Sequence, residues 1–153
     1  MHKRARAWST WLQAAVLLSV AAGASYWLAY AGSRSLDREA LKSVVGELRS
    51  QAAVGRLLAE QSASGRLTGT FLETQTEQAR KNIESERGEL KSSDVEPGVV
   101  GPSARASALA GRLDDDYAAL ARSYGDAETA AALRREFDAL FSELKSLEDG
   151  LGE

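Results

Sequence analysis

The chain has 153 residues, a formal net charge of −3 and no cysteine. This length allows one domain and an anchor, and the missing thiols exclude disulfides, thiolate metal sites and cysteine nucleophiles. The single histidine is His2, so the rest of the chain lacks the imidazole on which many metal sites and general bases depend. Acidic residues begin at Asp37 and outnumber basic ones from there on, which argues against nucleic acid as a partner.

Residues 1–10 form a short basic tail. They include Lys3, Arg4 and Arg6 and no acidic residue. Positive charges beside a membrane-spanning segment stay on the cytoplasmic side. We therefore expect this tail to be cytoplasmic and its three cations to set the topology of the chain.

Residues 11–31 contain no charged side chain and predict a single transmembrane helix. About twenty residues, at a rise of about 1.5 Å each, match the roughly 30 Å hydrocarbon core of a bilayer. Aromatic rings, which settle at the headgroup layers, flank the segment at Trp8, Trp11, Tyr26, Trp27 and Tyr30. We expect an anchor in a bacterial-type inner (plasma) membrane, with the remaining chain in the periplasm.

A cleaved secretory signal is the alternative interpretation of this segment. Residues 29–31 read Ala-Tyr-Ala, which matches an A-x-A site for cleavage after Ala31. We favour a retained anchor, because aromatic belts and a full spanning length serve no purpose in a discarded peptide. Both interpretations export the rest of the chain.

One face of the predicted anchor carries a small residue at every fourth position, namely Ala15, Ser19 and Gly23. This spacing lets two helices approach closely in lipid, which suggests that a second transmembrane helix packs there. An alanine-rich sequence also produces such spacing by chance, so both interpretations stay open.

The exported body, residues 34–149, is predicted to be all-α, because apolar residues recur at steps of three and four. The expected helices cover residues 36–63, 71–92, 104–124 and 127–149, and the loop 93–103 holds both prolines. Similar lengths and short connections predict an antiparallel, up-down four-helix bundle. Its core is small, so either the helices pack very closely or a partner completes the bundle.

Two turns carry specific signals. Gly65 as a C′ residue and the T-x-x-E pattern at 70–73 favour two helices over one continuous helix across 36–92. Gly125 followed by Asp126 predicts a tight turn between the last two helices.

No cluster in the body predicts catalysis or a cofactor. The acidic run at 114–116 is interpreted as a solvated helix face, because successive helical side chains point in different directions. Arg49, Arg56 and Arg66 are placed to line an anion-binding groove, although solvated arginines are the simpler interpretation. No phosphate-loop, dinucleotide-binding, hydrolase or zinc-protease motif occurs, so we expect no enzymatic activity and no cofactor.

The order of basic tail, spanning segment and exported bundle resembles the periplasmic ligand-binding region of bacterial chemoreceptors and related sensor kinases. We expect no second spanning segment after Leu147, so the resemblance implies that a signal passes through a partner protein. The order also resembles that of phage inner-membrane spanins. The glycines of the first helix and the tight final turn depart from the spanin pattern.

We therefore expect a non-enzymatic, single-pass membrane protein whose exported bundle is a protein-interaction or accessory scaffold module. Its expected partners are the lipid bilayer and another membrane or exported protein, or a second copy in a homo-oligomer. One alternative is a periplasmic ligand-sensing bundle, with a pocket between the first and fourth helices, that works through a partner. Another is an envelope-bridging component, spanin-like or associated with secretion.

Overall fold

The computed structural model describes residues 35–92 and 94–152. Over these ranges the chain forms four α-helices and one short 3-10 helix. They are α2 (Arg38–Ala63), α3 (Gly69–Ser92), η1 (Pro97–Val99), α4 (Val100–Arg122) and α5 (Ala127–Gly152). The prediction of an all-α fold is confirmed for the body, whose described residues form no strand and a single isolated β-bridge.

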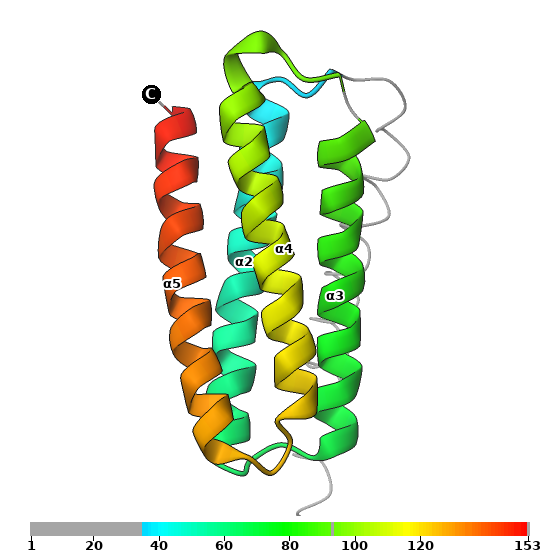
Figure 1. The fold of residues 1–153 in the computed structure, drawn as a ribbon, viewed down its shortest axis with the longest axis vertical. Helices are drawn as coiled ribbons and strands as arrows, with labels where there is room; N and C mark the ends of the chain where they lie inside the picture. Colours follow the sequence, from blue (N-terminus) through cyan, green and yellow to red (C-terminus); the bar gives the residue numbers. More distant parts are fainter. Residues whose placement is uncertain (1–34, 93, 153) are drawn as a thin grey trace, which may run out of the picture. The chain divides into compact units, whose positions relative to one another are not determined.

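The four helices run antiparallel in chain order and form a bundle (Figure 1). The closest pair consists of the first and last helices of the bundle, α2 and α5. Helix α3 packs mainly on α4 and makes a looser contact with α2. The bundle is therefore asymmetric around its axis.

Helix α2 begins at Arg38, two residues after the predicted start at Leu36. The backbone of Leu36 is extended because it pairs with the segment around Val95. The N–H of Leu36 donates to the carbonyl of Asp94 at 2.7 Å, and its carbonyl accepts from the N–H of Glu96 at 3.3 Å. The helix starts once Asp37 can cap it, with Asp37 Oδ1 accepting from the Ala40 N–H at 2.8 Å. The buried Leu36 side chain thus closes one end of the core.

The predicted break between α2 and α3 is confirmed. Gly65 has φ +65°, a conformation that glycine adopts without steric cost. The N–H of Arg66 donates to Gln61 O and the N–H of Gly65 donates to Ser62 O, each at 3.0 Å, which is the hydrogen-bond pattern of a Schellman motif. These bonds satisfy carbonyls that the end of a helix otherwise leaves unpaired.

The predicted start of the next helix was wrong by two residues. Helix α3 begins at Gly69 instead of residue 71, and the expected capping box at 70–73 is not its cap. Thr68 takes this role, because its Oγ1 accepts from the N–H of Phe71 at 3.3 Å. Thr68 is the first hydroxyl residue after the glycine turn, so the chain enters the helix earlier.

The predicted tight turn between α4 and α5 is also confirmed. Gly125 has φ +84°, and Asp126 caps α5. Asp126 Oδ1 accepts from the Thr129 N–H at 3.0 Å, and Oδ2 accepts from the Thr129 hydroxyl at 2.6 Å. These hydrogen bonds lower the pKa of Asp126 and stabilise its charged form at the positive end of the helix.

Two helices extend beyond their predicted bounds. Helix α4 starts at Val100, four residues before the expected position, so the loop is shorter than 93–103. Pro102 is compatible with this start because the first turn of a helix needs no N–H donor there. Helix α5 continues through Gly150 to Gly152, where the buried Leu151 packs against the core and holds the last turn.

One layer of the core is a contact between a glycine and two aromatic rings. The Phe137 ring of α5 lies directly on Gly55 of α2, where a Cβ atom would fall 2.4 Å from the ring. Tyr117 of α4 meets Phe137 edge-on, with ring centroids 5.0 Å apart. The Tyr117 hydroxyl donates to the carbonyl of Gln51 on α2 at 2.8 Å. This Gly55–Phe137–Tyr117 layer joins three of the four helices.

Aliphatic side chains fill the core on both sides of this layer, and every helix contributes some of them. The largest are Leu41 and Leu48 of α2, Leu72 and Ile83 of α3, Leu113 and Leu120 of α4, and Leu140 and Leu144 of α5. Small residues such as Ala52, Ala59, Ala79, Ala106 and Ala110 lie between them. Helices α2 and α5 thus pack closely, which is one of the two explanations that the small core left open.

We predict that Gly55→Ala destabilises the bundle by about 2–3 kcal/mol, because the new methyl group overlaps the Phe137 ring and forces α2 and α5 apart. The melting temperature should fall by roughly 10 °C, measured by far-UV circular dichroism during heating.

Gly88→Ala on α3 is the matched control. No atom lies within 4 Å of its new methyl group, so helix propensity should stabilise it by up to about 1 kcal/mol. Equal effects of the two substitutions would contradict the close approach of α2 and α5.

Candidate functional site

The residues assigned to membrane topology lie outside the described ranges. They are Lys3, Arg4 and Arg6 of the tail, Ala15, Ser19 and Gly23 of the packing face, and Trp8, Trp11, Tyr26, Trp27 and Tyr30 of the aromatic belts. Among the helices that the structure describes, none has the length and the apolar character to cross a bilayer. The anchor at 11–31 therefore stays a prediction.

The three arginines suggested for an anion groove do not converge. Arg49 lies at the seam between α2 and α5, where its Nη1 is 2.7 Å from Glu148 Oε2 and its guanidinium is 5.9 Å from the centre of the Phe141 ring. Arg66 is exposed in the turn after α2. A groove between the first and fourth helices would need these cations free and facing one another, and the structure separates them.

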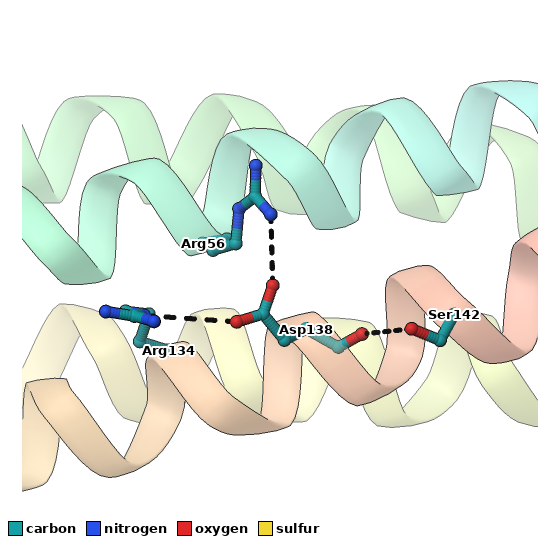
Figure 2. A network of polar contacts seen from close by, with 4 residues as sticks. All are labelled: Arg56, Arg134, Asp138 and Ser142. Carbon is teal, nitrogen blue, oxygen red and sulfur yellow. Dashed lines mark hydrogen bonds and ion pairs between the residues drawn. The ribbon is translucent and has the colours of Figure 1, made fainter.

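Arg56 belongs to a second ion pair at the same seam, shown in Figure 2. Asp138 accepts from Arg56 Nη1 at 3.1 Å and lies 3.9 Å from Arg134 Nε. The backbone carbonyl of Asp138 accepts from the Ser142 hydroxyl at 3.0 Å. These side chains are substantially exposed, so the pairs contribute little stability. Their effect is to neutralise Arg56 and to align α2 with α5.

A charged groove lies between α3 and α4. Its lining residues are Glu77, Arg80, Lys81, Glu84, Arg87 and Asp114. Arg80 donates to both carboxylate oxygens of Asp114, at 2.8 and 3.3 Å, and Lys81 pairs with Glu77 at 2.7 Å. The Nε atom of Arg87 is buried and has no hydrogen-bond partner among the described residues. Most of the charge of this groove is therefore already neutralised.

The side chains of the acidic run at 114–116 diverge. Asp114 pairs with Arg80 of α3, whereas Asp116 faces α5. Burial and, to a smaller extent, the charge of the nearby Glu136 raise the pKa of Asp116 to about 6, while Arg112 opposes this shift. Within the described residues, no group of three or more acidic or histidine side chains is placed to hold a metal ion.

Glu86 is a half-buried carboxylate on α3. Burial, as the largest cause, and the charges of Glu89 and of Glu47 on α2 together raise its pKa to about 7. The spacing from Ile83 and Leu90 places Glu86 on the apolar side of α3, and this signal could have identified Glu86 from the sequence.

The outer face of α2 consists of four uncharged residues that are exposed, namely Ser43, Ser50, Val54 and Leu57. Leu57 is 57 % exposed and Val54 is 42 % exposed. Phe71, Val100 and Tyr124 are the other large apolar side chains that are exposed among the described residues. Sequence reasoning missed the exposure of Leu57, because Leu57 fits the apolar pattern of the helix.

The segment order resembles known sensor and spanin architectures, and this resemblance concerns layout alone. Comparison of the chain with protein-family models, with curated proteins and with solved structures gives no match. The sites described above therefore rest on the side chains of this structure alone.

We predict that the bundle becomes more stable as the pH falls from 8 to 5. A carboxyl whose pKa is raised on folding binds more protons in the folded state, so stability is gained below the folded pKa and lost as the pH rises through it. For Glu86 this window runs from about 7 down to its ordinary value of 4.5. The melting temperature at pH 5 should exceed that at pH 8 by roughly 5 °C.

Glu86→Gln should raise the melting temperature at pH 8 and remove a large part of this pH dependence, because the neutral amide resembles the protonated acid. Glu84→Gln, on the exposed side of the same helix, is the control and should leave the pH dependence unchanged. Parallel pH profiles for wild type and Glu86→Gln would contradict the assignment.

Proposed function

We propose that this chain is a non-enzymatic, single-pass membrane protein whose extracytoplasmic bundle binds a protein partner as an accessory or scaffold module. The observation that carries the proposal is the uncharged outer face of α2, where Leu57 and Val54 remain exposed. Burying these side chains against a partner would remove apolar surface from water, at about 25 cal/mol per Å².

Two features of the described residues support interaction over chemistry. The core between the helices is filled by side chains of all four helices, and the arginines of the α2–α5 seam are neutralised by Glu148 and Asp138. Several charged groups form ion pairs along the seams, and in the charged groove between α3 and α4 two such pairs, Arg80–Asp114 and Lys81–Glu77, neutralise most of the charge. A bundle of this kind is better suited to contact another protein through its surface than to enclose a small molecule.

The proposed location follows from the sequence before Ser35. The uncharged segment 11–31 has the length of a membrane span, the cations Lys3, Arg4 and Arg6 precede it, and all acidic residues follow it. By the positive-inside rule this places residues 1–10 in the cytoplasm of a bacterial-type cell and the bundle in the periplasm. A retained anchor would hold the bundle at the surface of the inner membrane.

Ligand sensing through a partner is the second candidate function. The observation that favours it is the groove between α3 and α4, where Arg87 carries a buried Nε atom without a hydrogen-bond partner in the described chain. The site would then lie between the second and third helices of the bundle. Small carboxylates added to the purified protein should raise its melting temperature if this groove binds them.

We predict that the full chain stays in the membrane pellet after extraction at alkaline pH, because a spanning helix resists removal whereas peripheral proteins dissolve. N-terminal sequencing of the extracted protein should show that residues 11–31 are retained. A mature protein that begins at Gly32, or one that is released by alkali, would contradict the anchor.

We predict that the chain, purified from membranes in mild detergent, is part of a complex larger than the 16.4 kDa of one chain. Leu57→Lys should dissociate this complex, because it places a charge in the apolar centre of the contact. Ser85→Lys, on the exposed side of α3, is the matched control and should leave the complex intact. Native mass spectrometry measures both. A lone chain for the wild type, or an unchanged complex for Leu57→Lys, would contradict the proposal.

A further inference from the structure

We propose that the charged groove between α3 and α4 binds a small zwitterion, a molecule that carries one ammonium group and one anionic group a few bonds apart. The inference deepens the ligand-sensing candidate and rests on it, since it names the chemical class of the ligand and the two side chains that recognise it. Binding of a protein partner through α2 does not depend on it.

The groove has room for a small molecule. Its volume is about 310 Å³, which lies at the lower end of the range for ligand pockets. The lining side chains are all charged, and five of the six come from α3 between residues 77 and 87, while Asp114 comes from the neighbouring α4 (Figure 1). Recognition in this groove therefore depends on ionic groups of the ligand.

The six charges of the lining balance, because three are cations and three are carboxylates. Four of them pair with one another inside the groove. Arg80 donates to both carboxylate oxygens of Asp114, at 2.8 and 3.3 Å, and Lys81 Nζ lies 2.7 Å from Glu77 Oε1. One cation and one carboxylate of the lining remain, and both belong to α3.

The remaining cation is Arg87. In the described part of the chain, no carboxylate lies within ion-pair distance of its guanidinium. The side chain is half-buried, and its Nε atom is buried without a hydrogen-bond partner among these residues. A buried donor without an acceptor costs free energy, and an anionic ligand supplies this acceptor in a strong, charge-assisted bond. Arg87 is therefore the position for the anionic group.

The remaining carboxylate is Glu84. Its side chain is exposed, and it has no cation within ion-pair distance over the described residues. Its negative charge acts on the groove, because Asp114 raises the pKa of Arg80 and the charge of Glu84 adds a smaller contribution. Glu84 is therefore the position for the ammonium group.

The spacing of these two side chains selects a ligand that carries both charges. Glu84 and Arg87 lie three residues apart, which places their Cβ atoms about 5–6 Å apart on one face of the helix. A simple anion would pair with Arg87 but meet the like charge of Glu84, and a simple cation would meet the like charge of Arg87. A zwitterion pairs with both side chains at once and leaves the groove neutral.

Two kinds of molecule supply this pair of charges. Free amino acids carry a carboxylate as the anionic group, and the ethanolamine headgroup of phospholipids carries a phosphodiester. Glycine and glycerophosphoethanolamine are the probes for them, added to the full chain in detergent at neutral pH in ligand-detected NMR titrations. At least one of the two should bind at least about tenfold more tightly than acetate and methylamine, each of which carries only one of the charges. The tighter zwitterion identifies the source.

Substitution of the two unpaired side chains tests their roles. Glu84→Gln should weaken the zwitterion by roughly tenfold and strengthen acetate by roughly threefold, because the like charge is removed. Arg87→Gln should weaken the zwitterion by a similar factor and strengthen methylamine. Glu60→Gln and Arg66→Gln each remove one exposed charge elsewhere and are the matched controls, with binding as in the wild type. Far-UV circular dichroism checks the fold of each variant, and Glu84 is exposed, so at least this variant should fold normally.

The binding pattern separates the outcomes. Zwitterions that bind no more tightly than acetate, while acetate does bind, overturn this inference and leave the ligand-sensing candidate intact for simple carboxylates. Wild-type affinity in both Glu84→Gln and Arg87→Gln also overturns it, because the ligand then binds elsewhere. If none of the four probes binds, both this inference and the ligand-sensing candidate are overturned.

Discussion

The contact between Gly55 and the Phe137 ring is the constraint on which the rest of this bundle depends. A side chain at position 55 would occupy the volume of the ring, so only glycine lets α2 and α5 approach this closely. The Tyr117 hydroxyl then donates to the carbonyl of Gln51 and ties α4 to the same layer. A buried tyrosine needs such a partner, since leaving its hydroxyl unpaired would cost about 1–3 kcal/mol.

The asymmetry of the bundle follows from this layer. Because α2, α4 and α5 meet there, α3 packs mainly on α4 and lies less closely against α2. The ion pairs that cross the seams reflect this arrangement, joining α2 to α5, α3 to α4 and α4 to α5. At the seam between α2 and α3, burial and the charge of Glu47 raise the pKa of Glu86. The same arrangement leaves the outer face of α2 to solvent.

Local signals predicted the turns of this fold better than the helix starts. Gly65 and Gly125 both adopt positive φ, because a chain that reverses there needs a conformation that side chains disfavour. The starts depend on which of several neighbouring polar residues caps the helix. Thr68 competes with Thr70, and the pairing of Leu36 with Asp94 and Glu96, which lie far along the chain, delays α2. A local pattern cannot contain such a pairing.

By itself, the sequence determined that the body is all-α, where its chain reverses, and which catalytic and metal-binding side chains it lacks, because these properties depend on residue identity and short-range spacing. Only the tertiary structure decided which charges are neutralised and which apolar residues are covered. Arg49 and Arg56 meet their carboxylates across a helix seam, and Leu57 is exposed while the adjacent Leu58 is buried. The neutralisation of charges and the covering of apolar residues both depend on which side of each helix faces its neighbours. The close approach at Gly55 fixes this side for α2 and α5.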